Sequence, residues 1–301
     1  MNIIKKIFYT NIVFTLLFIG KVCYANSDNT SKVLSESVFQ KSKDSTLYNL
    51  YNKADSLFKV KKFTTSLKFA LKVIDASKEV NNLDLVSNTN YLIGRIWYAS
   101  RAYKKALVYF QKSVVGYTRI FEEKKFSNYH LEKHHVNDDF SILNGNLQIA
   151  KSYQRLFELF IENKGKDSLN KLHREKALFF YDKILQSNSL SNDVSLLRSK
   201  AYNNISGIYM RDSVYLKAEE YLLKSLEIKK RLKDKYLLAS GYNALSNIYF
   251  FEREYEASKK ALSLGLKSIK NIKGKRADEI RAGLLLNMAY SMYKLKDYHA
   301  Y

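Results

Sequence analysis

Two blocks of this sequence lie forty residues apart and match in residue type at nearly every apolar position: YNNISGIY at 202–209 and YNALSNIY at 242–249. Each block is followed by an aromatic, a small and a large residue, which are Tyr215, Ala218 and Leu222 in one case and Tyr255, Ser258 and Leu262 in the other. A fixed period of about 20 to 50 residues is typical of architectures in which one helical or strand unit stacks on the next. The repeat therefore predicts an array of similar units.

Four further stretches carry the same pattern. Residues 93–110 are a close copy, with Ile93 and Gly94 in the first part and Ala106 and Phe110 in the second. Weaker copies, assigned mainly by their position in the array, lie at 50–70, 153–181 and 285–298. Together the copies predict about six repeats.

Helices are the expected building element of each repeat. Proline is absent from all 301 residues and glycine occurs only 10 times, and these are the residues that break or loosen helices. From Ser45 onward, apolar residues recur at intervals of three and four positions, which is the period of an amphipathic helix. Hydrophobic residues make up 46% of the chain, enough for a buried core. The fold class predicted is all-α.

The spacing within each copy resembles the tetratricopeptide repeat (TPR), although the proline that closes a repeat of that family is missing throughout. The resemblance implies a right-handed superhelical solenoid of antiparallel helix pairs, the last pair incomplete. Small residues such as Gly94 and Ala218 are expected where two helices cross closely. This domain is predicted to span 45–301, with an irregular insertion around 121–146.

The amino terminus has the three-part layout of a secretory signal. Lys5 and Lys6 precede an apolar run that Lys21 limits to less than the roughly 20 residues a membrane-spanning helix needs. Small residues Cys23 and Ala25 occupy the positions that a signal peptidase inspects. We therefore expect residues 1–25 to be a signal peptide and the chain to be exported, as a periplasmic protein or as a membrane-associated one facing the periplasm. An uncleaved anchor and lipidation at Cys23 are the alternatives.

Residues 26–44, rich in Ser, Asn, Asp and Lys, are predicted to be a flexible spacer. The formal net charge of the chain is +22, which would suit a polyanionic partner such as an acidic polymer or lipid headgroups. However, the lysines are scattered along every segment and no nucleic-acid-binding motif accompanies them. The charge is interpreted mainly as a feature of a Lys-rich composition, and no nucleic acid is expected as a partner.

No catalytic constellation is visible: the sequence has no glycine-rich phosphate loop, no Gly-x-Ser-x-Gly elbow and no metalloprotease motif. His130 and His134 would share one helix face, as metal ligands can, but no glutamate stands where a zinc hydrolase needs its base. We expect neither an enzyme nor a cofactor or metal site.

Function is then expected to lie on a surface. In a TPR array, the first helix of each pair lines a concave groove. Transferring the family's groove positions onto this sequence gives a candidate ligand or peptide groove made of Tyr91, Arg95, Tyr98, Asn203, Asn204, Arg211, Asn243, Asn247, Phe250, Tyr290 and Tyr293. Asn amides can hydrogen-bond a peptide backbone and aromatic rings supply rigid contact area. The alternative is that Asn simply suits exposed helix positions in an Asn-rich chain, and the lysines of the family's carboxylate clamp are not reproduced.

The last residues, Lys296 to Tyr301, look like the turn into a second helix that is itself absent. The sequence is therefore expected to be incomplete at its carboxyl end. It is similar to the extracytoplasmic TPR regions of bacterial signalling proteins of the sensor histidine kinase or helix-turn-helix regulator type. This resemblance implies a protein- or peptide-binding sensor region of a transmembrane protein. The alternative is a free-standing periplasmic scaffold or adaptor.

Overall fold

The computed structural model describes residues 30–126, 131–162 and 167–295. Within these ranges the chain is helical apart from short connections. The helices are α2 (Thr30–Lys59), α3 (Phe63–Glu79), α4 (Leu83–Ala99), α5 (Tyr103–Phe126), α6 (Leu131–Glu162), α7 (Asp167–Leu185), α8 (Asn192–Arg211), α9 (Tyr215–Arg231), α10 (Lys235–Phe251), α11 (Tyr255–Ser268) and α12 (Lys275–Leu295). The chain divides into two compact units, Met1–Thr46 and Leu47–Tyr301. The second unit contains the helix pairs.

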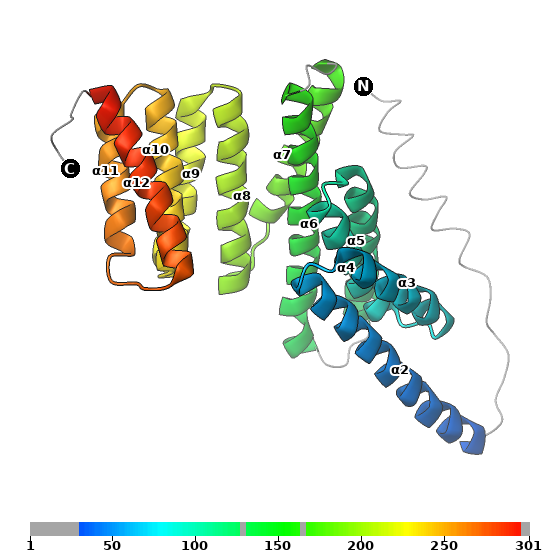
Figure 1. Cartoon of the computed structure of the whole chain (residues 1–301). Coiled ribbons are helices and arrows are strands. Elements are labelled where there is room, and N and C mark those ends of the chain that lie inside the picture. The colour runs from blue at the N-terminus through cyan, green and yellow to red at the C-terminus, as the bar shows by residue number, and fades with distance from the viewer. Residues whose placement is uncertain (1–29, 127–130, 163–166, 296–301) are drawn as a thin grey trace. The chain divides into compact units, whose positions relative to one another are not determined.

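Consecutive helices of this unit pack against each other in antiparallel order (Figure 1). The repeat blocks of the sequence coincide with the first helices of the pairs α2/α3, α4/α5, α6/α7, α8/α9 and α10/α11, and α12 is the first helix of a sixth. First helices also contact each other, α6 with α8 and α10 with α12. The predicted all-α solenoid of helix pairs is confirmed.

Small residues lie at the helix crossings, as the repeat pattern predicts. Ala106 and Ala218 are completely buried, and Ser246 and Ser258 are each about 1% exposed. Gly94 lies so close to α5 that a methyl group in its place would stand 2.5 Å from Cδ1 of Phe110. The large neighbours therefore fill the space that the small residue leaves, which is how helices interlock.

Short turns join most of the helices without glycine or proline. Six of them contain one residue in the left-handed backbone region, and these residues are Lys61, Asn81, Arg101, Ser213, Lys233 and Arg253. The following N–H then bonds back to a carbonyl of the last helical turn, as from Ala102 to Trp97 and from Glu254 to Tyr249, each at 2.8–2.9 Å. These bonds close the helix ends, so a non-glycine residue is held in a conformation it ordinarily avoids.

Two sequence expectations about irregular segments differ from the structure. Helix α2 begins at Thr30, so the predicted spacer 26–44 is helical from that residue on. The predicted insertion 121–146 consists of the end of α5 and the first half of α6, apart from 127–130, which lie outside the described residues. Both stretches are polar but lack proline, so their polarity alone does not interrupt a helix.

Other expectations concern parts that the structure does not describe. These are the signal peptide 1–25, His130, the side chain of His134 and the tail from Lys296 onward. Among the helices of the described part, none is long and apolar enough to span a membrane.

Candidate functional site

An amide cluster joins the first helices α10 and α12. Nδ2 of Asn287 on α12 donates to Oδ1 of Asn243 at 2.9 Å and to Oδ1 of Asn247 at 3.1 Å, both on α10. These two bonds leave Nδ2 of Asn243, Nδ2 of Asn247 and Oδ1 of Asn287 without a partner in the described part of the chain. All three residues are half-buried. The cluster therefore presents amide donors and one acceptor at fixed positions, which a peptide backbone can match.

A pocket of about 460 Å³ opens beside this cluster, between α10, α11 and α12. Its lining residues are Asn247, Phe250, Phe251, Ser258, Asn287, Tyr290 and Ser291, none of them charged. Ser258 and Ser291 are buried and hydrogen-bonded to each other at 2.9 Å, so they close the base of the pocket. A pocket of this composition suits an uncharged, largely apolar group.

The aromatic walls of the pocket differ in exposure. Phe250 is half-buried and meets Tyr255 of α11 edge-on, with ring centroids 5.4 Å apart. Phe251 and Tyr290 are 58% and 56% exposed although both are large. Phe251 stacks on Tyr215 of α9, which holds one face of its ring. Aromatic side chains, Tyr and Phe among them, are enriched in protein interfaces.

A buried lysine reaches toward α8 from the second helix α9. Nζ of Lys229 donates to Oδ1 of Asn203 at 3.0 Å, and the lysine is only 5% exposed. Its ammonium also lies close to α10, because a methyl group at Gly241 would stand 3.2 Å from Nζ. Burial, which disfavours the charged ammonium, lowers the pKa of Lys229 to about 8. The Oδ1 of Asn203, like that of Asn243, therefore accepts a hydrogen bond within the chain, and its Nδ2 has no partner among the described residues.

The predicted groove residues Arg211 and Asn204 take part in a different network. Nε of Arg211 lies 3.7 Å from Oε1 of Glu158, a buried carboxylate of α6 that also pairs with Arg155. Asn204 lies near the hydroxyl of the buried Tyr181 on α7, which donates to Oε1 of Gln154 on α6 at 2.6 Å and whose pKa is raised mainly by burial. These contacts tie α6, α7 and α8 together, so a structural role accounts for both side chains.

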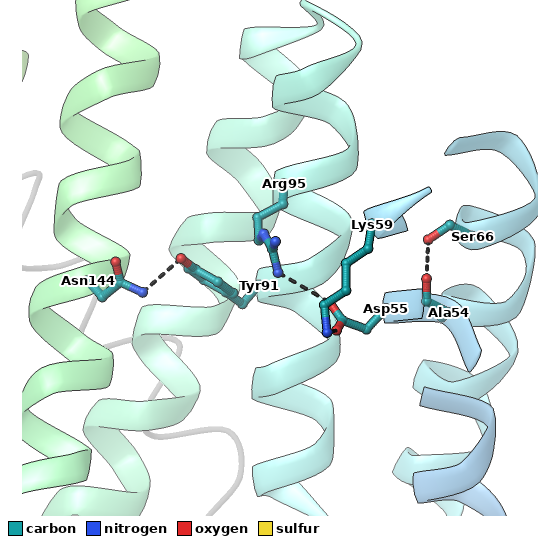
Figure 2. Close-up of polar contacts among 7 residues, drawn as sticks. All are labelled: Ala54, Asp55, Lys59, Ser66, Tyr91, Arg95 and Asn144. Carbon is teal, nitrogen blue, oxygen red and sulfur yellow. Dashed lines mark hydrogen bonds and ion pairs between the residues drawn. The ribbon is translucent and has the colours of Figure 1, made fainter. Parts of the chain in front are cut away.

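The predicted residues of α4 form a third group, near α2 and α6 (Figure 2). Nη1 of Arg95 pairs with Oδ1 of Asp55 at 3.3 Å, and Asp55 also pairs with Lys59 at 2.6 Å. The hydroxyl of Tyr91 accepts a hydrogen bond from Nδ2 of Asn144 at 2.8 Å. Tyr98 meets Tyr103 of α5 edge-on at 5.2 Å. The positive charge of Arg95 is thus already balanced by an acid of the chain.

Of the residues predicted to form one groove, the structure brings together Asn243, Asn247, Phe250 and Tyr290. Tyr293, 61% exposed, is not among the residues that line the pocket. Sequence reasoning missed the pocket residues Asn287, Phe251, Ser258 and Ser291. Asn287 stands forty residues after Asn247, so the repeat period itself could have identified it. As ligand contacts, all of these residues remain predictions.

The helix pairs, the small residues at their crossings and the contacts between first helices define a TPR-like helical-repeat fold. No protein-family model matches the chain, and no curated protein matches it. Solved structures do. The chain is similar to the apo form of the quorum sensor NprR from B. thuringiensis, with a TM-score of 0.60 and 19% identity over 86% of this chain and 62% of that one. It is also similar to TTC0263, a thermophilic TPR protein of Thermus thermophilus (TM-score 0.51, 14% identity, 81% of this chain and 99% of that one).

A third similar structure is BtubC from P. vanneervenii, with a TM-score of 0.50 and 16% identity over 84% of this chain and 85% of that one. At these identities the likeness is one of fold alone. The chain spans 62% of the length of the NprR chain.

Proposed function

We propose that this protein is a non-enzymatic TPR-like module that binds a peptide or an extended protein segment. The observation that carries the proposal is the pocket between α10, α11 and α12. Exposed aromatic rings stand there beside amide NH₂ groups that have no partner among the described residues. TPR-like folds serve many ends, so the argument rests on this pocket and not on the fold.

The chemistry of the pocket indicates how such a segment would lie. The spare Nδ2 groups of Asn243 and Asn247 would donate to peptide carbonyls, and Oδ1 of Asn287 would accept from a peptide N–H. One uncharged side chain of the ligand would enter between Phe251 and Tyr290. Backbone bonds give affinity and the side-chain pocket gives specificity, the division of roles seen in other modes of peptide recognition.

To test the proposal, peptides that bind the protein are selected from a displayed random library. Their affinities are then measured by calorimetry. Asn247→Ala combined with Asn287→Ala should weaken binding about tenfold or more, because each lost hydrogen bond contributes around 1 kcal/mol. The matched control is Asn49→Ala, which removes an exposed amide of α2 that takes no part in the cluster. Selected peptides that bind the double variant as tightly as the original protein would contradict the proposal.

The reach of the groove is tested separately. Asn203→Ala removes the amide of α8 that corresponds to Asn243 in the repeat. A further loss of affinity with long but not with short peptides would show that the ligand extends from α10 to α8. No change for any peptide length would confine the site to α10–α12.

We further propose that the module acts outside the cytoplasm, as the sensor region of a transmembrane signalling protein. The amino-terminal signal-like sequence supports export, and the occurrence of the fold in a quorum sensor supports sensing at the level of fold only. The alternative is a free-standing periplasmic scaffold. Amino-terminal sequencing of the envelope-fraction protein should give Asn26, whereas a soluble cytoplasmic pool retaining Met1 would refute export. Codons after Tyr301 that encode a membrane helix and a kinase or DNA-binding domain would favour the sensor, and a stop codon the scaffold.

A further inference from the structure

One edge of the array carries a dense group of cations. The turn between α9 and α10 and the turn between α11 and α12 together contain nine basic residues and one acid, Asp234, in 230–235 and 267–276. The basic residues are Lys230, Arg231, Lys233, Lys235, Lys267, Lys270, Lys273, Lys275 and Arg276, and every one of them is exposed. Because successive helices are antiparallel, these turns lie at the same end of their helices. We name this group the basic edge.

The opposite edge of the same helices has no such excess. The turns between α8 and α9 and between α10 and α11, residues 211–217 and 251–257, hold three basic and four acidic residues. The charge of the chain is therefore scattered in sequence but divided unequally in space. A uniformly Lys-rich composition does not produce this division.

Contacts show that the two turns of the basic edge are neighbours. The guanidinium of Arg276 lies over the ring of Tyr236, 4.4 Å from its centroid, and so bridges the start of α12 to the start of α10. A hollow of about 510 Å³ opens beside α12, and its charged lining residues are Lys270, Lys273, Arg281 and Asp278. The guanidinium of Arg281 pairs with Asp278 and donates to the carbonyls of Ile269 and Ile272, so it holds the turn in shape.

The cations of the basic edge are not balanced within the array. None of the nine takes part in a salt bridge with a residue in the described ranges. Like charges gathered in this way repel one another, and an external anionic surface relieves that repulsion.

We propose that the basic edge docks this protein on an anionic phospholipid surface. The cations stand on two neighbouring turns at the same end of their helices, so one anionic surface can meet several of them together. Seven of the nine are lysines, whose compact, hydrated charges suit diffuse attraction to headgroups more than forked recognition of single phosphates. Arg276 occupies one face of the Tyr236 ring, so that face is not free to stack on a base. The pocket between α10, α11 and α12 is a separate feature. The peptide-binding proposal and the membrane-docking proposal can therefore fail independently.

The test measures co-sedimentation of the protein with phosphatidylglycerol vesicles and with phosphatidylcholine vesicles. Lys230, Lys270 and Lys273 are changed together to Gln, and the matched control changes Lys104, Lys217 and Lys260 to Gln. Both triple variants lower the net charge by three at exposed positions, and both retain any contribution of the amino-terminal segment. Circular dichroism and the urea midpoint confirm that the variants fold.

The wild-type protein should bind phosphatidylglycerol vesicles and not phosphatidylcholine vesicles. The basic-edge variant should lose about a hundredfold in partitioning, since each lysine near an anionic surface contributes about fivefold. The control should lose less than about threefold, and 0.5 M NaCl should remove the difference. The proposal would be overturned if both variants lost vesicle binding equally or if neither lost it. It would also be overturned if soluble polyglutamate at equal charge displaced the protein completely from the vesicles.

Discussion

Replacing Gly94 by alanine tests the close crossing of α4 and α5. The new methyl group would stand 2.5 Å from Cδ1 and 2.6 Å from Cε1 of Phe110, well inside normal contact. Phe110 is completely buried and cannot move into solvent. Overpacking of this kind costs about 1–3 kcal/mol. The glycine-to-alanine change in a helix returns about 1 kcal/mol, so the free energy of unfolding should fall by up to about 2 kcal/mol.

Gly283 is the matched control within the same fold. It also lies inside a helix, α12, but a methyl group there would meet no atom within 4 Å. Gly283→Ala should therefore raise the free energy of unfolding by about 1 kcal/mol through helix propensity alone. The difference between the two variants isolates the crossing, which is predicted to contribute about 1–3 kcal/mol.

Urea unfolding followed by circular dichroism at 222 nm measures both variants. A double-mutant cycle with Phe110→Leu identifies the cause, because a smaller side chain opposite Gly94 should remove most of the penalty. The reasoning is refuted if Gly94→Ala raises the urea midpoint as much as Gly283→Ala does, or if Phe110→Leu leaves its effect unchanged.

Three other predictions concern stability. Ala218→Leu should overpack a completely buried position and lower the free energy of unfolding by about 1–3 kcal/mol; an unchanged urea midpoint would show that the repeat register is wrong. Ser213→Gly should raise the free energy of unfolding by about 0.5–1 kcal/mol, since glycine accepts the φ of 59° without strain. Ser213→Ala keeps the strained backbone and should not raise it. The pKa of Lys229 is about 8 in the folded chain, below the 10.5 of a free lysine. Between these two pH values the unfolded chain binds more protons than the folded chain. The free energy of unfolding should therefore rise with pH across that window. Urea titrations at pH 7.5 and 10.5 should show this rise for the original protein and not for Lys229→Met. The same pH dependence in both proteins would place the Lys229 ammonium in solvent and contradict the prediction.

The fold was predictable because its determinants are local. The period of forty residues, the lack of proline and the small residues Gly94 and Ala218 each act on one helix or one crossing, and each appears directly in the sequence. The polar stretches 26–44 and 121–146 were harder to predict. Polarity resembles a loop signal, but without helix-breaking residues a polar stretch can continue a neighbouring helix.

The candidate site was predictable only in part. Repeat positions identified Asn247, Phe250 and Tyr290, which line the pocket, and Asn243 in the amide cluster beside it. They did not show that Asn287 would use its amide to join two of these residues, because that bond depends on the distance between α10 and α12. For the same reason the sequence could not show that Asp55 neutralises Arg95, forty residues further along the chain. Contacts between repeats decide which polar groups remain available to a ligand.

Site-specific photo-crosslinking tests the proposed peptide site most directly. Tyr290 is replaced by p-benzoylphenylalanine and the protein is irradiated with a library-selected peptide. A second protein carries the photo-reactive residue at Leu216, which is 78% exposed on α9 and does not line the pocket. The peptide should crosslink at position 290, and an excess of the same peptide without its label should suppress this crosslinking. Little crosslinking should occur at position 216. Equal crosslinking at both positions, or crosslinking at position 216 alone, would contradict a binding site between α10, α11 and α12.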